Sequence, residues 1–336
     1  MAMNFKEGRW NHEINVTDFV KTNITPYEGD ASFLSGPTER TKAVWNKCLE
    51  ALAEERANNG VRSLDPSTVS TITSFAPGYI DKENEVIVGL QTDEVLRRAI
   101  KPFGGIKVVE KACRENGVEV DPKVKDIFTH YRKTHNDGVF DAYTEEIRSF
   151  RSLGFLTGLP DNYARGRIIG DYRRLALYGL DRLIEAKQND LRHLTGPMTD
   201  ARIRLREEVA EQIKALKEIK IMGEQYGLEL GRPAHNAQEA VQWVYMAYLA
   251  AVKEQDGAAM SLGNVSSFLD IYIEYDMAHG LLDEAHAQEL IDQFVIKLRM
   301  VRHLRMQAYT DIFAGDPTWV TESIGGRFND GRTKVT

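Results

Sequence analysis

The run AQEAVQWVYMAYLAAVKE, which follows Asn236, is apolar on nearly every side when it is drawn as a helix. A helix of this kind has no face for water, so a core must cover it all round. Asn236 followed by Glu239 resembles a helix N-cap with a reciprocal acceptor, which indicates where the helix begins. A chain of 336 residues with 42% hydrophobic content is long enough for two ordinary domains or one large α/β core around it.

Two further helices are expected from apolar periodicity. One runs from Ala201 to Met222, where apolar residues recur at spacings of three and four opposite a charged face. Its apolar residues are Leu205, Val209, Ile213 and Leu216. The other runs from about Asp283 to Met306. Two short apolar runs, EVIVGL at 85–90 and GFLTGLP at 154–160, suit buried strands. The first eighty residues read as an irregular, mostly helical lead-in.

The charge pattern excludes some classes of partner. With 43 basic and 50 acidic residues the formal net charge is −7, and basic residues form no long run, so a broad nucleic-acid footprint is not expected. The N-terminus has no apolar signal segment, and no window approaches eighteen apolar residues, so no membrane association is expected. Only two cysteines occur, Cys48 and Cys113, without metal-ligand spacing. We expect a cytoplasmic protein.

Several familiar site motifs are absent or incomplete. Neither the dinucleotide fingerprint nor the P-loop motif occurs. The segment around Gly280 imitates part of a calcium-binding loop, but it lacks the alternating carboxylates, so a plain helix-turn-helix is expected. His130 and His135 lie five residues apart and do not share a helical face, so we interpret them as surface or packed histidines. No metal site is expected.

The stretch TGLPDNYARGRIIGDYRR, residues 157–174, concentrates four arginines before a helix. One of them could present its planar fork to a small carboxylate, whereas the others could pair with Asp161 and Asp171. We assign the binding role to Arg167 and structural pairing to Arg165, Arg173 and Arg174, although spacing alone leaves both possibilities open.

Two aromatic residues, Phe313 and Trp319, flank the sequence AGDPT. Ordinary packing explains most aromatic side chains. In a site they would form a dry wall that keeps water from a reactive intermediate.

Taken in order, the segments resemble one family along nearly the whole chain. They include TPYEGD, IVGLQT, PFGGIK, YRKTHN, RGRIIGDYRR, NAQEA, YLAAVKEQDGAAMS, KLRMVR and GDPTW. They are similar to pyruvate formate-lyase of the glycyl radical enzymes. The resemblance covers roughly the first half of that family's catalytic chain.

The resemblance implies an α/β fold: the helix-rich N-terminal portion of a ten-stranded barrel, built from two sets of five parallel strands and incomplete here. Residues 1–80 would be the lead-in, and residues 81–336 the first part of the barrel with its surrounding helices. The implied activity is formate C-acetyltransferase, in which pyruvate and coenzyme A give acetyl-CoA and formate during anaerobic glucose fermentation. The implied partners are a radical S-adenosylmethionine activating enzyme and a second copy in a homodimer.

Residue by residue, Arg167 matches the arginine that holds the pyruvate carboxylate in the family. The resemblance also implies that Ala258 lies beside the substrate and that Phe313 and Trp319 match aromatic residues of the pocket wall. The family's adjacent cysteines, its second substrate arginine and its radical glycine have no counterpart here, so no catalytic residue is expected in this chain. The glycyl radical would lie in a C-terminal part, and coenzyme A would be a co-substrate.

The final sequence, WVTESIGGRFNDGRTKVT, offers nothing apolar to pair with, and we interpret the chain as a partial sequence of a complete enzyme. Three alternatives stay open: a truncated, non-catalytic scaffold or interaction protein, a 2-ketobutyrate formate-lyase, and a glycyl radical dehydratase. One methylene in an apolar wall is worth only about 1–3 kcal/mol, so the sequence does not separate pyruvate from 2-ketobutyrate.

Overall fold

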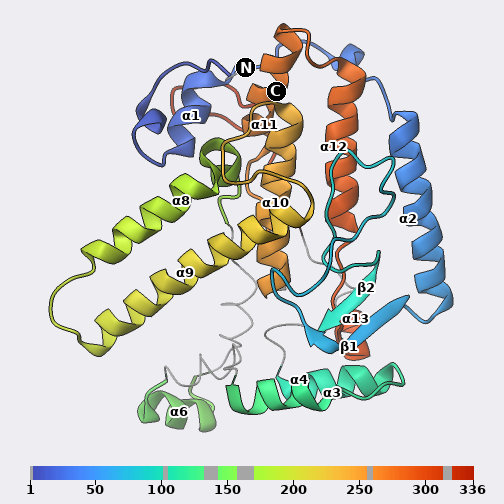
Figure 1. The fold of residues 1–336 in the computed structure, drawn as a ribbon, viewed down its shortest axis with the longest axis vertical. Coiled ribbons are helices and arrows are strands. Elements are labelled where there is room, and N and C mark those ends of the chain that lie inside the picture. Colours follow the sequence, from blue (N-terminus) through green and yellow to red (C-terminus); the bar gives the residue numbers. More distant parts are fainter. Residues whose placement is uncertain (1–2, 101–104, 132–142, 157–169, 256–259, 313–319) are drawn as a thin grey trace.

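A computed structural model describes residues 3–100, 105–131, 143–156, 170–255, 260–312 and 320–336. Three helices occupy the middle of these residues: α10 (Ala237–Gln255), α11 (Ser266–Ala278) and α12 (Glu284–Arg299). Helix α10 packs against both α11 and α12, and the N-terminal helix α1 (Val16–Asn23) packs against α11 near the top of Figure 1. Most residues of α10 are buried, as its all-round apolar pattern predicts.

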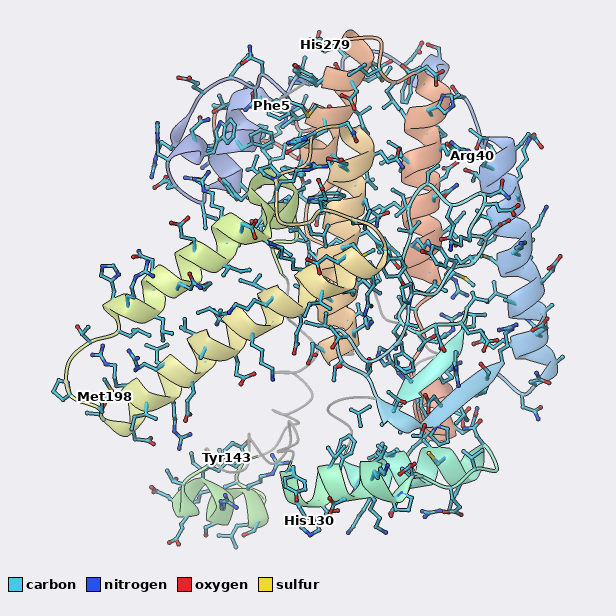
Figure 2. The ribbon with its side chains drawn as sticks, in the orientation of Figure 1. Phe5, Arg40, His130, Tyr143, Met198 and His279 are labelled. Carbon is cyan, nitrogen blue, oxygen red and sulfur yellow. The ribbon has the colours of Figure 1, made fainter. Side chains whose placement is uncertain are left out.

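A long helical hairpin extends from this centre. It consists of α8 (Arg173–His193) and α9 (Asp200–Gln225), with Met198 at its tip (Figure 2). Val209 and Ile213 on α9 are buried as predicted, whereas Leu205, which lies toward the tip, is 43% exposed. The amphipathic helix expected over residues 201–222 is therefore confirmed and slightly longer than expected.

The sheet is small and parallel. Strand β1 (Ser63–Val69) pairs with β2 (Arg97–Ile100), and an isolated parallel bridge from Ala99 to His303 brings residues 301–304 beside β2. Residues 1–80 are thus not only an irregular helical lead-in, because they contain β1. Asp65 and Pro66 lower the strand signal of β1, and a register irregularity between Leu64 and Val69 accommodates them.

One of the remaining elements, helix α2 (Glu39–Ala57), stands on the right-hand side of Figure 1. It packs on α12 through Val44, Cys48 and Ala51. Helix α4 (Pro122–Asp126) lies against β1. The other short elements are η1 (Arg9–Asn11), η2 (Ala31–Phe33), α3 (Ile106–Glu115), η3 (Ile127–Tyr131), α6 (Glu145–Ser152) and α13 (Gln307–Ile312).

The strand expected at 85–90 is not formed. Glutamine side chains take the place of a neighbouring strand: Gln293 Oε1 accepts a hydrogen bond from Val86 N at 2.7 Å, and Gln238 Nε2 donates to Val86 O at 3.0 Å. Gln242 bonds both Val88 N and Val88 O, at 2.7 and 2.9 Å. The apolar run is buried between α10 and α12. Its backbone N–H and carbonyl groups therefore form hydrogen bonds with helix side chains and not with a neighbouring β-strand.

Three other local predictions need correction. The helix expected to reach Met306 ends at Arg299, because Leu304 N donates to Ala99 O and the chain becomes extended beside β2. Residues 154–156 form a turn closing α6 and not a strand, and residues 157–160 of that prediction lie outside the described part. Asn236 does cap α10 through Glu239 N, but the Glu239 carboxylate accepts from His235 N and from Arg232 in place of Asn236 N.

The helix-turn-helix expected around Gly280 is confirmed, since α11 and α12 flank that turn. Within the described residues, no helix is both long and apolar enough to cross a membrane.

Candidate functional site

All four predicted site residues fall in segments outside the described residues. Arg167 belongs to 157–169, Ala258 to 256–259, and Phe313 and Trp319 to 313–319. The described residues that flank these segments nevertheless show where the chain leaves and re-enters them. These flanks are the framework of the candidate site.

Two of the flanks run side by side. Leu262 N donates to Thr321 O at 2.8 Å, and Ser323 N donates to Gly263 O at 2.6 Å. Gly263 and Glu322 form a parallel bridge between these hydrogen bonds. The chain that follows 256–259 is therefore attached directly to the chain that follows 313–319.

The third flank joins the same place through Arg173. Its Nε donates to Asp171 Oδ1 at 2.7 Å, and its Nη1 donates to Asn264 O at 3.1 Å. Arg174 also pairs with Asp171, since its Nε lies 3.7 Å from Asp171 Oδ2. The structural interpretation of Arg173 and Arg174 is thus confirmed, whereas Arg165 and Asp161 lie outside the described residues.

We call the contacts among Asp171, Arg173, Asn264 and Glu322 the junction. The Glu322 carboxylate closes it, since Oε1 accepts from Val265 N at 2.7 Å and from Ser266 N at 3.0 Å, at the start of α11. Burial raises the pKa of Glu322 despite these hydrogen bonds and the nearby Arg173 guanidinium. Its role in the described structure is to hold the first turn of α11.

Apolar and aromatic side chains lie next to the junction. Tyr172 and Tyr248 are buried and pack edge to face, with ring centroids 5.7 Å apart. Met260 and Leu262 are also buried. Burial raises the pKa of Tyr172, so this hydroxyl stays neutral at physiological pH. These four side chains are therefore shielded from solvent in the described structure.

The other side of segment 256–259 begins at the C-terminal end of α10. Ser70 Oγ donates to Lys253 O at 2.7 Å, and Ile72 N donates to Glu254 Oε1 at 3.1 Å. Ser70 N in turn donates to Ile100 O. The end of α10 therefore lies at the carboxyl ends of β1 and β2.

Lys253 is a polar residue of this region that the sequence reasoning missed. It is 2% exposed, and burial lowers the pKa of its ammonium group to about 8. A lysine in the last turn of a helix ordinarily reads as a solvated partner of the helix dipole. The signal for burial was the apolar sequence AYLAAV that precedes it.

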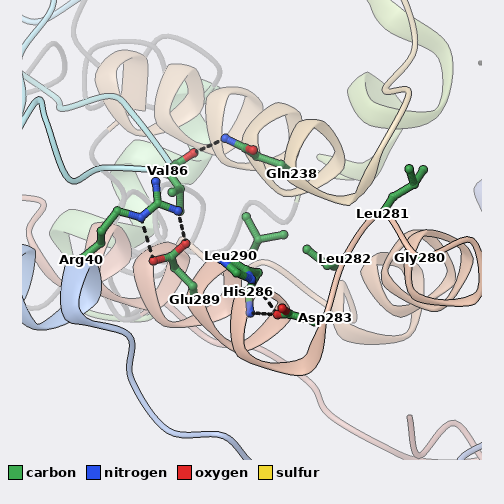
Figure 3. Close-up of a pocket in the computed structure, with 10 residues that line it drawn as sticks. All are labelled: Arg40, Val86, Gln238, Gly280, Leu281, Leu282, Asp283, His286, Glu289 and Leu290. Carbon is green, nitrogen blue, oxygen red and sulfur yellow. Dashed lines mark hydrogen bonds and ion pairs between the residues drawn. The ribbon is translucent and has the colours of Figure 1, made fainter.

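A surface pocket lies on another face, over the turn between α11 and α12 (Figure 3). Its volume is about 570 Å³, and its charged groups are already paired within it. Arg40 Nε donates to Glu289 Oε1 at 3.1 Å, and His286 Nδ1 lies 2.6 Å from Asp283 Oδ1. Its described lining residues include none of the four residues of the junction.

The cysteines and His130 behave as structural residues. Cys48 and Cys113 are buried, and burial raises the pKa of the Cys48 thiol to about 12 and that of the Cys113 thiol also. His130 points outward at the edge of the molecule (Figure 2) and pairs with Asp126 at 2.8 Å, whereas His135 lies outside the described residues. The described parts of the chain hold no cluster of three or more potential metal ligands.

Comparison with known proteins identifies the family. The model of the "Pyruvate formate lyase-like" family matches residues 7–336. The chain belongs to this family. A family relative from Haemophilus influenzae, described as a formate acetyltransferase, is 56% identical over 99% of this chain. The match covers 44% of that relative, so the chain spans less than half the relative's length.

Solved structures agree on the fold of the family. The B12-independent glycerol dehydratase from Clostridium butyricum superposes with a TM-score of 0.65 at 17% identity, over 91% of this chain and 45% of its own. A glycyl radical enzyme from Archaeoglobus fulgidus gives 0.55 at 15% identity, over 90% of this chain and 43% of its own. The expected fold class, a helix-rich and incomplete portion of the α/β glycyl radical enzyme domain, is therefore confirmed.

Proposed function

We propose that this chain is the N-terminal part of a formate C-acetyltransferase, which converts pyruvate and coenzyme A to acetyl-CoA and formate. The observation that carries the proposal is the 56% identity to a formate acetyltransferase along 99% of the chain. The junction supports it, because the flanks of all three segments with predicted substrate contacts are hydrogen-bonded to one another.

In this proposal Arg167 holds the substrate carboxylate, since a planar guanidinium can bind both carboxylate oxygens at once. Ala258 lies beside the substrate, and Phe313 and Trp319 form the pocket wall. The buried Tyr172, Tyr248 and Met260 extend a dry surface next to these segments, which suits chemistry that water would quench.

The radical glycine and the catalytic cysteines belong, in this proposal, to the remaining length of the polypeptide. When generated there, the glycyl radical would supply the one-electron chemistry that cleaves the carbon–carbon bond of pyruvate. A radical S-adenosylmethionine enzyme would activate the protein, which would act as a cytoplasmic homodimer in anaerobic glucose fermentation. Residues 81–336 would contribute to the barrel, and β1 adds a strand from residues 1–80 to the same region.

The test uses the complete polypeptide that contains this chain. After anaerobic activation, with the glycyl radical quantified by electron paramagnetic resonance, pyruvate and coenzyme A should yield formate and acetyl-CoA in equal amounts. Glycerol in place of pyruvate serves as the control, and it should give no dehydration product. A full radical signal without pyruvate-dependent formate would contradict the proposal.

A further inference from the structure

Asn264 is the residue at which the three flanks of the candidate site meet. It lies on the flank that follows segment 256–259, and its main-chain oxygen accepts a hydrogen bond from Arg173 Nη1 at 3.1 Å. Its side-chain Nδ2 donates to Ser323 O at 2.6 Å, on the flank that follows segment 313–319. One residue therefore contacts both other flanks, each through a different polar atom.

The orientation of the Asn264 amide is fixed by its two side-chain contacts. Its Oδ1 accepts a hydrogen bond from the hydroxyl group of Ser267, a buried residue of α11. The atom that faces Ser323 O must be the amide nitrogen, because a carbonyl oxygen only accepts hydrogen bonds. The side chain thus connects the start of α11 to the neighbouring flank.

The main chain does not supply this connection. Main-chain hydrogen bonds already join the two flanks, and one of them is donated by Ser323 N. Where the chain turns into α11, however, Val265 N and Ser266 N donate to Glu322 Oε1. The described partner of Ser323 O is the Asn264 side chain, which adds a hydrogen bond where the main-chain pairing ends.

Asn264 is also close along the chain to predicted substrate contacts. Ala258 precedes it by six residues, and Trp319 precedes its partner Ser323 by four. An extended residue spans at most about 3.6 Å, so chain connectivity limits how far Ala258 and Trp319 can move relative to these two residues. Small displacements of a substrate contact lower activity, because binding groups act only within a narrow range of geometry.

We propose that Asn264 is a positioning residue of the substrate site, whose amide ties the flank that follows segment 256–259 to the flank that follows segment 313–319. Asn264 itself does not touch the substrate. It acts through Ala258 and Trp319, and so through the fit of the 2-oxo acid between them. This inference rests on the proposed function, which assigns those two residues to the pyruvate site.

The experiment replaces Asn264 with aspartate in the complete, activated polypeptide. Asn264→Asp keeps the oxygen that faces Ser267 and loses the donor to Ser323 O. We expect kcat/KM for pyruvate to fall roughly three- to tenfold, mainly through KM, which is the effect of one lost hydrogen bond. The kcat/KM for coenzyme A and the radical yield should keep their wild-type values, because the contacts that Asn264 positions are assigned to the 2-oxo acid.

A stability measurement separates positioning from folding. Ser323 is exposed, so water can bond its carbonyl in the variant. The added carboxylate lies at the start of α11, where the helix dipole favours negative charge. The melting temperature of Asn264→Asp should therefore stay level or rise. A melting temperature that falls together with both kcat/KM values would show a general structural defect and overturn the inference.

Asn23→Asp is the matched control. The amide oxygen of Asn23 accepts from Lys6 N at 2.8 Å, and its amide nitrogen donates to Phe19 O at 3.0 Å, so the substitution removes the same kind of hydrogen bond elsewhere. It should leave kcat/KM for pyruvate unchanged, and a fall equal to that of Asn264→Asp would overturn the inference.

Wild-type kcat/KM for pyruvate in a folded Asn264→Asp protein would overturn it too. If that variant does not fold, Asn264→Ala removes the same donor without adding a charge, and the same comparison applies. None of these results contradicts the proposed function, which fails separately if the activated wild type releases no pyruvate-dependent formate.

Discussion

Individual glutamines decide the conformation of the buried run at 85–90. Gln242 is 3% exposed, and its amide bonds both the N–H and the carbonyl of Val88, as a neighbouring strand would. Gln238 and Gln293 do the same for Val86 from two different helices. These three glutamine side chains thus supply the backbone hydrogen bonds that an apolar, β-branched segment ordinarily forms with a neighbouring strand.

Replacing Gln242 with leucine should therefore be costly. The Val88 N–H and carbonyl would lose their partners in a largely buried place, and we expect the free energy of unfolding to fall by about 2–4 kcal/mol. Gln212→Leu is the control, because Gln212 Nε2 donates to the exposed Glu208 carboxylate one turn earlier on α9. Urea unfolding of both variants tests this, and equal stabilities would contradict the bridging role of Gln242.

Arg167 and Arg174 form a matched pair for the carboxylate assignment. Arg167→Lys keeps the charge and loses the bidentate fork, so formate release by the activated complete enzyme should fall by tenfold or more. Arg174→Lys should retain nearly full activity, since Arg174 is half exposed and its pairing with Asp171 is worth about 0–1 kcal/mol. Near wild-type turnover in Arg167→Lys, at normal radical yield, would end the assignment.

Asp270 on α11 makes the stability depend on pH. Burial, with a smaller contribution from Glu274, raises the pKa of Asp270 to about 7. Between about pH 4 and pH 7 the folded protein retains a proton that the unfolded chain has released, so stability falls as pH rises through this range. The slope from this one group reaches at most about 1.4 kcal/mol per pH unit.

Asp270→Asn should remove that slope and raise the stability at pH 7.5 relative to the wild type. Urea unfolding at intervals from pH 5 to pH 8 measures it. Asp190→Asn, at an exposed position on α8, should leave the pH dependence unchanged. If the free energy of unfolding changes with pH in the same way in the wild type and in Asp270→Asn, Asp270 is not the source of the pH dependence.

At the scale of elements, the sequence predicted what depends on local periodicity. The helices α9 and α10 and the turn between α11 and α12 follow from apolar spacing and capping residues within one segment. The strands were missed because their pairing is non-local and their residues, SLDPSTV and RRAI, carry little strand propensity. The end of α12 was misjudged because Val301 and Leu304 are buried beside β2 and so extend the apolar pattern beyond the helix.

Helix α8 contains a kink that only glycine allows. Gly179 has φ of 69°, and a Cβ there would lie 2.4 Å from the carbonyl carbon of Arg232 and from the carbonyl oxygen of Gly231. Leu180 N and Asp181 N bond the carbonyls of Leu230 and Gly231 across this contact. The kink thus joins α8 to the chain between α9 and α10.

Gly179→Ala should destabilise the protein by more than about 3 kcal/mol, because positive φ and a backbone clash act together. Gly227→Ala separates the two effects. Gly227 has a similar φ of 75°, but a methyl group there would meet nothing within 4 Å, so a loss of about 1–2 kcal/mol is expected. Thermal unfolding of both variants measures the difference, and equal losses would show that the close approach to Gly231 is unimportant.

At the scale of the whole molecule, the order of the family's segments predicted the fold class and the family, since both depend on the entire chain. The site was predicted less completely. Arg167, Ala258, Phe313 and Trp319 came from resemblance, whereas the junction and Lys253 required the folded structure. Glu322 and Arg173 are 149 residues apart in sequence, and no local pattern relates them. Burial of Lys253 likewise depends on β1, which is far from it in sequence.

One surface of the described structure remains apolar and exposed. Helix α6 has no buried residue, and Ile147, Phe150, Leu153, Phe155 and Leu156 around it are 36–76% exposed. The chain spans only 44% of its relative from Haemophilus influenzae. Apolar patches of this kind on a protein surface ordinarily mark a contact with further protein. In the proposed enzyme, the remaining polypeptide would supply that contact.

The 336-residue chain produced alone should therefore self-associate in a way that depends on this patch. Size-exclusion chromatography with light scattering should give oligomers whose population falls in the double variant Phe150→Ser/Phe155→Ser, because these two rings contribute much of the exposed area. Leu281→Ser is the control, since Leu281 is 70% exposed but lies in the turn between α11 and α12, on another face. A wild-type chain that elutes as a monomer with a cooperative melt would instead support the scaffold alternative, in which the chain functions without a covering partner.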